Sequence, residues 1–160
     1  MTTTPLPAPK LRLVLHIDAA LGTPVDLGQD ADGRRHRIVP HVGGTFTGPE
    51  LMTGIVLPGV SGDWLTINPD GSSIGDIRMG LHSASGANLY LQMRALRHGP
   101  PEVLARLAAG ADVDPSEYVF RANAQIEATE PDLSWLNLGV FTVVAGRQPD
   151  GVSFDVYIVE

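Results

Sequence analysis

Short segments in which polar and apolar residues alternate follow one another along the whole chain. In the first of them one face of the extended strand is aliphatic and consists of Leu11, Leu13, Leu15 and Ile17. This period of two residues is typical of a half-buried strand. Eighteen Gly and thirteen Pro divide the 160 residues into such segments, so the sequence favours many short strands joined by turns over long helices.

The same pattern predicts nine or ten strands. Their ranges are 10–18, 35–39, 45–47, 51–57, 63–68, 74–83, 88–97, 118–128, 136–145 and 152–159. A Ser-Gly and two Pro-Asp-Gly sequences predict tight turns between antiparallel neighbours. One helix is predicted at residues 100–109, where Val103, Leu104 and Leu107 form an apolar stripe.

Consecutive antiparallel strands must either stack as two sheets or close into one barrel, because open edges invite pairing with other chains. Several strands carry Arg, Asp, Asn and Gln on one face and aliphatic residues on the other, which suggests a barrel with a polar lumen that binds a ligand. We therefore predict a mainly β protein, a single closed or nearly closed antiparallel β-barrel of about 8–10 strands with one short helix. The barrel domain is expected at residues 10–160, after a flexible lead-in at residues 1–9.

The balance of charge limits the partners. The chain has 11 Lys and Arg against 18 Asp and Glu, a net charge of −7. Nucleic acid and anionic membranes first attract positive charge, so neither is expected as a partner. The start of the chain lacks the pattern of a secretory signal and no apolar run is long enough to span a membrane, so we expect a cytoplasmic protein.

The residue types also limit the cofactors. The chain has no Cys, which excludes disulfides, thiol nucleophiles and Cys-based metal sites. Its five His have no spacing typical of a metal site, and no phosphate-binding glycine loop or dinucleotide fingerprint is present. We therefore expect neither a metal nor another cofactor.

Three charged residues are the predicted catalytic groups: Asp63, Asp76 and Arg121. A carboxyl buried in an apolar-walled barrel has a raised pKa and can exchange a proton near neutral pH. The planar guanidinium of Arg121 suits a substrate oxyanion. The alternative is structural, with each carboxylate paired to Arg78, Arg94 or Arg121.

Aromatic and polar residues on neighbouring segments are the predicted substrate-binding groups. They are Trp64, Arg78, Tyr90, Arg94, Trp135, Asn137 and Tyr157. The two Trp can stack on a planar ligand or pack in the core. Asn137 and Tyr157 can orient a carbonyl or satisfy backbone groups.

Sequence motifs from both halves of the chain carry a family resemblance. They are Gly-Gly-Thr-Phe-Thr-Gly-Pro at 43–49, the segment 54–64, Leu-Arg-His-Gly-Pro-Pro-Glu-Val-Leu at 96–104, the segment 114–121, Ser-Trp-Leu-Asn at 134–137 and Phe-Asp-Val-Tyr at 154–157. With these the chain resembles the domain of unknown function 3237 family over nearly its whole length. The resemblance implies a closed barrel of the lipocalin-like or allene-oxide-cyclase-like kind and implies no established activity.

These observations leave three hypotheses for the function. The first is a cofactor-independent enzyme of the isomerase, cyclase or lyase type, which binds a small, partly apolar, oxygenated molecule in the barrel. The second is a non-catalytic small-molecule binding or carrier protein that uses the same pocket. The third is a structural role as a homo-oligomer.

Overall fold

A computed structural model of the chain describes residues 5–160, in which ten strands form a single antiparallel sheet. The strands are β1 (Leu11–Leu21), β2 (Val25–Gln29), β3 (Arg35–Thr47), β4 (Thr53–Val56), β5 (Gly62–Ile67), β6 (Ser73–Ser83), β7 (Asn88–His98), β8 (Val119–Ala128), β9 (Phe141–Arg147) and β10 (Gly151–Val159).

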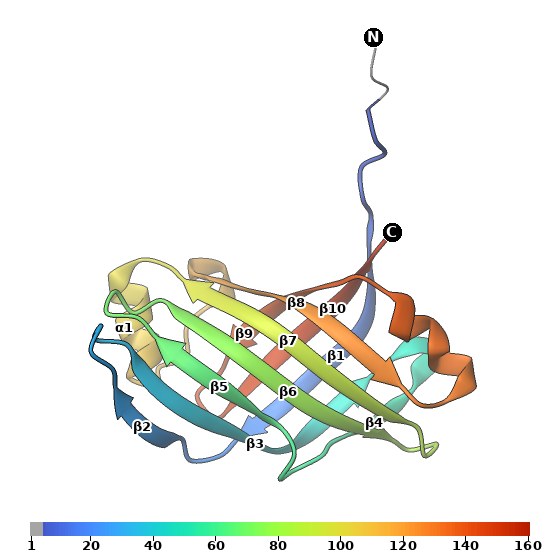
Figure 1. The fold of residues 1–160 in the computed structure, drawn as a ribbon, viewed down its shortest axis with the longest axis horizontal. Helices are drawn as coiled ribbons and strands as arrows, with labels where there is room; N and C mark the ends of the chain where they lie inside the picture. The colour runs from blue at the N-terminus through green and yellow to red at the C-terminus, as the bar shows by residue number, and fades with distance from the viewer. Residues whose placement is uncertain (1–4) are drawn as a thin grey trace.

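The sheet closes on itself into a barrel (Figure 1). The ring runs in the order β1, β10, β9, β8, β7, β6, β4 and β3, and β3 pairs with β1 to close it. β2 pairs with the first half of β3, while β4 and β5 share the gap between β3 and β6. The closed barrel confirms the predicted fold class, and it leaves the eight strands of the ring without a free edge.

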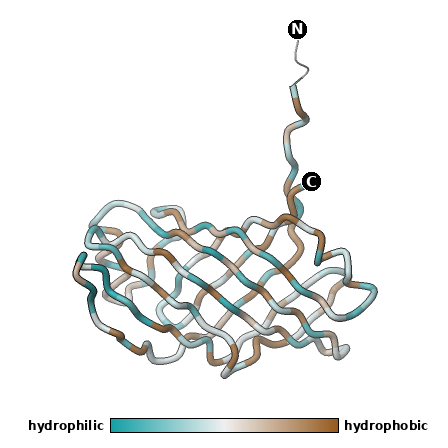
Figure 2. Tube along the Cα trace, in the orientation of Figure 1, coloured by the Kyte–Doolittle hydropathy of each residue, from teal (hydrophilic) through white to brown (hydrophobic). Residues whose placement is uncertain are grey.

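The hairpin of β6 and β7 has the clearest alternation. Every second residue of β6 is buried, from Ser73 to Ser83, and β7 continues the pattern. Figure 2 shows it as a change between polar and apolar residues along the strands. The hairpin turns at the predicted Ser-Gly pair, where Gly86 has a φ of 96° that residues with a side chain rarely adopt.

The inward faces of the strands form an apolar core. Leu15, Met79, Leu81 and Leu91 have no exposed surface, and they fill the barrel toward the β6–β7 turn. Complete burial of one such side chain stabilises a fold by roughly 1.5–3 kcal/mol. The interior of this half of the barrel is therefore filled, and a second pocket of the structure lies outside this core, between the 3-10 helix η1 (Pro49–Leu51), the β6–β7 turn and the segment 130–135.

β1 does not keep its predicted alternation. Its pairing with β10 shifts register between Leu13 and Leu15, and Val14 is buried beside Leu15. Leu11 and Leu13 consequently lie outside, 58% and 50% exposed. The prediction that the aliphatic residues of this segment share one face is wrong, because a bulge reverses the phase of the strand.

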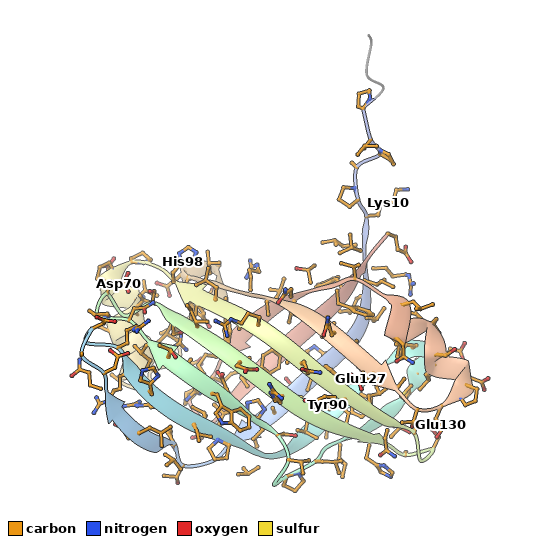
Figure 3. All side chains as sticks on the ribbon, in the orientation of Figure 1. Lys10, Asp70, Tyr90, His98, Glu127 and Glu130 are labelled. Carbon is orange, nitrogen blue, oxygen red and sulfur yellow. The ribbon has the colours of Figure 1, made fainter. Side chains whose placement is uncertain are left out.

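The polar rows of β6, β7 and β8 lie on the outer surface of the barrel. Figure 3 shows Tyr90 and Glu127 on the outside of the wall, and the buried positions of these strands are the alternate, mostly apolar ones. The prediction of a lumen lined by these rows is wrong. Leaving rows of Arg, Asn, Gln and Glu in water avoids the cost of desolvating them.

The helix α1 (Pro101–Ala108) confirms the predicted helix and is one residue shorter at each end. It buries Val103, Leu104 and Leu107, and Leu104 packs against Gly71 in the β5–β6 turn. α1 therefore lies at the end of the barrel opposite the β6–β7 turn (Figure 1).

Short 3-10 helices replace parts of two predicted strands. η1 (Pro49–Leu51) precedes β4, so the strand predicted at 51–57 begins only at Thr53. η3 (Pro131–Leu138) occupies the start of the strand predicted at 136–145. A third one, η2 (Pro115–Glu117), precedes β8, and β2 was not predicted.

The chain enters the barrel from an extended segment. Residues 1–4 of the predicted lead-in at 1–9 lie outside the described residues, and residues 5–9 have no regular secondary structure. In Figure 1 the segment extends away from the barrel beside the end of β10. No helix among residues 5–160 is both long and apolar enough to cross a membrane.

Candidate functional site

A cavity of about 50 Å³ lies inside the barrel at the end that carries α1. In Figure 3 Asp70 and His98 mark this end, and Glu130 marks the opposite one. The polar groups of the lining are His41, Asp63, Ser73, Arg97 and Arg147. Its apolar walls include Ile77, Ala95, Phe120 and Phe154.

Asp63 supplies the acidic group. β5 places it opposite Val39 of β3 and Ile77 of β6. The carboxyl lies over Gly75, where a Cβ atom would stand 2.8 Å from Asp63 Oδ1, so only glycine leaves room for it. Asp63 Oδ1 is buried without a hydrogen-bond partner. Burial raises the pKa of Asp63 from 3.8 to about 7, although the positive charge of Arg97 acts in the opposite direction.

Arg97 supplies the cation. It lies at the end of β7, opposite Ser73 of β6, and its guanidinium carbon is 5.8 Å from the centroid of the Phe120 ring. Its Nε is buried without a hydrogen-bond partner. No carboxylate in residues 5–160 lies within 4.0 Å of its nitrogens. Burial, followed by the like charge of Arg147, lowers the pKa of Arg97, as expected for a cation without a close counter-ion.

The remaining polar groups are more firmly held or uncharged. The Arg147 guanidinium donates to the carbonyls of Pro149 and Gly151, both at 3.0 Å, and its backbone N–H donates to the Tyr118 hydroxyl at 2.8 Å. His41 is 2% exposed, and burial lowers its pKa to about 4. His41 is therefore neutral at pH 7, and it adds no charge to the pocket.

The pocket combines a carboxyl that exchanges its proton near neutral pH with a cation that lacks a close counter-ion. A group whose pKa lies near the working pH serves well as a general acid or base. A guanidinium can bind the oxygen of a carboxylate, a carbonyl or an enolate. Apolar walls strengthen both effects, because they keep the local dielectric constant low.

Of the three predicted catalytic residues, only Asp63 lines the pocket. Asp76 lies on the outer face of β6, 3.5 Å from Arg78. Arg121 is exposed on β8 and donates a hydrogen bond to the backbone oxygen of Phe120. The prediction that Arg121 faces the cavity is wrong. In β8 Phe120 and every second residue after it point inward, so Arg121 points outward.

None of the seven predicted substrate-binding residues lines this pocket. Arg78 and Arg94 are exposed, Tyr90 and Tyr157 are half-buried at outward positions, and Trp64 is 46% exposed.

Two of the seven predicted residues lie on η3, at the other end of the barrel. Trp135 packs beside the core, under the Arg12 guanidinium. Asn137 exchanges two hydrogen bonds with the backbone of Ala128, which is its predicted structural alternative.

Sequence reasoning missed Arg97, Arg147, His41 and Ser73 as pocket residues. For Arg97 and Arg147 the sequence contains a signal, because each stands at a position where the alternation of its strand places a buried, apolar residue. Arg97 follows Met93 and Ala95 at every second position, and Arg147 likewise follows Ala145. A charged residue in phase with the buried face, at the end of a strand, marks a polar pocket in a barrel.

The residues of the pocket do not form a metal centre. Among residues 5–160 no three or more His, Asp or Glu side chains are grouped as metal ligands.

The fold and the pocket define the class of this protein, a closed antiparallel β-barrel with a polar pocket at one end. Residues 9–159 match the family described as "Protein of unknown function (DUF3237)". The chain belongs to this family, which confirms the predicted resemblance.

Relatives in bacteria cover nearly the whole chain. The UPF0311 protein blr7842 of Bradyrhizobium diazoefficiens is 34% identical over 148 residues, which are 92% of this chain and 95% of the relative. The crystal structure of RPA1785 from Rhodopseudomonas palustris, described as a conserved protein of unknown function, has 30% identity and a TM-score of 0.90, and covers 97% of this chain and 100% of that one.

The crystal structure of an enzyme from Penicillium herquei has 14% identity and a TM-score of 0.70 over 100% of both chains, and so shares the fold.

Proposed function

We propose that this barrel binds a small oxygenated, partly apolar molecule and acts on it as a cofactor-independent enzyme of the isomerase, cyclase or lyase type. The observation that carries the proposal is the buried Asp63, whose pKa is about 7, in one cavity with Arg97, which has no close counter-ion. Likeness of fold alone does not carry a function. The description of the Penicillium herquei protein as an enzyme adds support for catalysis in a barrel of this shape.

The proposed reaction begins with proton removal by Asp63. Its carboxylate takes a proton from a carbon next to a substrate carbonyl, and the electron pair of that C–H bond moves to the carbonyl oxygen. Arg97 stabilises the resulting enolate by charge and hydrogen bonding. Asp63, now protonated, returns the proton to the other face of the same carbon or, where a C=C bond is conjugated with the enolate, to the far end of that double bond; the carbonyl re-forms, so an isomer with the same atoms leaves. Loss of a leaving group or ring closure can start from the same enolate.

Exchange of substrate hydrogen for solvent deuterium tests this proposal. The probes are acetone, 2-butanone and pyruvate, incubated with the protein in D₂O at pD 7–8 and followed by NMR. We expect exchange in at least one of them to be about 10²–10⁴-fold faster with the wild-type protein than with Asp63→Asn, the usual contribution of a general base.

The matched control for this experiment is Asp32→Asn, in the β2–β3 turn, where the carboxylate is 77% exposed and pairs with Arg34. This variant should exchange at the wild-type rate. Equal rates for wild-type and Asp63→Asn proteins with every probe would show that the proposal is wrong. Saturable binding of a probe together with such equal rates would favour the binding or carrier hypothesis.

A further inference from the structure

We propose that the ligand of this pocket carries a carboxylate, which binds the Arg97 guanidinium while Asp63 is in its neutral, protonated form. The inference deepens the proposed function, because it assigns a chemical class to the molecule that enters the same cavity. It concerns the binding step, in which Asp63 is neutral; proton removal from the bound ligand then requires Asp63 to release its own proton first, and the inference holds whether or not that reaction follows.

The charges at this end of the barrel point to an anion. Besides the exposed Arg34, Arg35 and Arg106, three half-buried arginines lie there, and two of these three already have partners. Arg147 donates to two backbone carbonyls and interacts with the negative charge of Asp150. Arg37 Nε is also buried without a hydrogen-bond partner, but it lies 3.8 Å from the Asp26 carboxylate, which balances its charge. Arg97 has no such carboxylate within residues 5–160, and its buried Nε lacks an acceptor. A buried, uncompensated cation is costly, so a bound anion stabilises it.

The size and walls of the cavity restrict that anion to a small one with one charge. About 50 Å³ is well below the roughly 150 Å³ of a cavity that holds benzene, so only a few non-hydrogen atoms enter. Ile77, Ala95 and Phe154 bound the space and offer no hydrogen bonds from their side chains. A second negative group would lie against these walls or against Asp63, so a monocarboxylate with a short apolar part fits best.

The state of Asp63 controls the binding of such a ligand. Its carboxyl lies over Gly75, whose partner on β7 is Ala95, two residues from Arg97. When Asp63 is ionised, its negative charge offsets that of Arg97 and repels a carboxylate. When Asp63 is protonated, it can donate a hydrogen bond to the same ligand. The other charges around Asp63 are those of Arg147 in the pocket and Asp76 on the outer face of β6, and His41 is neutral above about pH 5.

The affinity for a carboxylate should therefore fall as the pH rises. With a pKa of about 7, Asp63 is protonated in roughly nine-tenths of the molecules at pH 6 and one-tenth at pH 8. Acetate is fully ionised over this range. We expect acetate to bind about tenfold more weakly at pH 8 than at pH 6.

The experiment is a titration with acetate and with acetamide, its neutral analogue of the same shape, followed by NMR of the protein at pH 6, 7 and 8. Acetate should bind at least tenfold more tightly than acetamide at pH 6. Arg97→Gln should abolish this preference, and Asp63→Asn should abolish the dependence on pH. The matched control, Arg35→Gln, removes an exposed arginine that pairs with Asp26 at the same end of the barrel and should leave both properties intact.

The wild-type protein alone already decides the inference, so failure of a variant to fold does not. Equal affinity for acetate and acetamide, or an acetate affinity that is constant from pH 6 to pH 8, would overturn it. Nitrate that binds as tightly as acetate would overturn the assignment to a carboxylate. Preference for acetate without any deuterium exchange would retain this inference and reject the proposed enzyme, whereas exchange in acetone without preference for acetate would do the reverse.

Discussion

Replacing Asp63 by Asn should make the stability of the protein less sensitive to pH. The free energy of unfolding of the variant, compared with that of the wild type, should be higher at pH 8 than at pH 4. The buried carboxyl has a pKa of about 7 in the folded chain and an ordinary value of 3.8 when exposed. Between these values the unfolded chain has released the proton while the folded chain still holds it, so a rise in pH favours unfolding. Below pH 3.8 the carboxyl is protonated in both states and has no effect; above pH 7 it has its full destabilising effect.

The magnitude follows from the difference between the two pKa values. About three pKa units at ~1.4 kcal/mol each give roughly 4 kcal/mol. Asn cannot ionise, and the fixed cost of burying its amide is the same at both pH values. For a chain of this length 1 kcal/mol corresponds to about 2–4 °C in the midpoint of thermal unfolding. The difference between the unfolding midpoint of the variant and that of the wild type should therefore increase by about 8–16 °C, in favour of the variant, from pH 4 to pH 8.

Thermal unfolding followed by circular dichroism at pH 4, 6 and 8 measures this difference. Asp32→Asn is the matched control, since it removes an exposed carboxylate and should follow the wild type at every pH. If the midpoints of wild-type and Asp63→Asn proteins differ by the same amount at pH 4 and pH 8, Asp63 ionises as freely in the folded chain as in the unfolded one. The Asp63 carboxyl would then be solvated, not buried, in the folded chain.

Three further substitutions test other parts of the fold. As the pH falls from 6.5 to 4, only the unfolded chain protonates His41, which destabilises the folded wild type by roughly 3 kcal/mol. His41→Leu should remove this contribution. Urea unfolding at the two pH values measures it. Leu91→Ala, in the filled half of the barrel, should cost about 2–5 kcal/mol in urea unfolding at pH 7, and a cost below 1 kcal/mol would show that Leu91 is not tightly packed. Tyr118→Phe removes the acceptor for the Arg147 backbone N–H and should cost about 1–3 kcal/mol in the same assay, whereas no change would show that water replaces the hydroxyl.

The strands and the barrel could be predicted because alternation and turn residues are local signals. Residues 73–83 and 88–98 alternate without interruption, and a Ser-Gly pair joins them, so the hairpin follows directly from the sequence. The bulge at Val14 could not be predicted, since it arises from the pairing of β1 with β10. Residues 136–138 end a 3-10 helix instead of starting a strand, and the hydrogen bonds of Asn137 to the distant Ala128 backbone, which hold them there, are not visible in the local sequence.

The site was harder to predict than the fold. Asp63 was identified by the chemistry of a buried carboxyl in an apolar barrel, and the structure places it in the pocket. The polar face that Arg121 shares with its neighbours predicts a place in the lumen, but such a face is hydrated and lies outside. Arg97 has the opposite pattern. It stands at the end of a row of alternate residues of β7 that are otherwise apolar and buried, so it shares no polar face that would draw attention to it. A polar residue in an apolar row is the more informative signal, because its burial needs a compensating function.

Two short strands, β4 and β5, fill one after the other the gap between β3 and β6, and they separate the filled core of the barrel from the wall of the pocket. Each half strand makes its own ladder to β3 and β6, β4 beside the filled core and β5 beside the pocket. Residues 57–61 join the two ladders; Leu57 and Ser61 at the ends of this joint are hydrogen-bonded to Gly80 of β6 and His41 of β3, and residues 58–60 lie between them. Insertions or deletions in this joint can reshape the wall around Asp63 while the register of both ladders is kept. The joint is therefore a point at which the wall of the pocket can change, by selection or by engineering, without rebuilding the barrel that supports it.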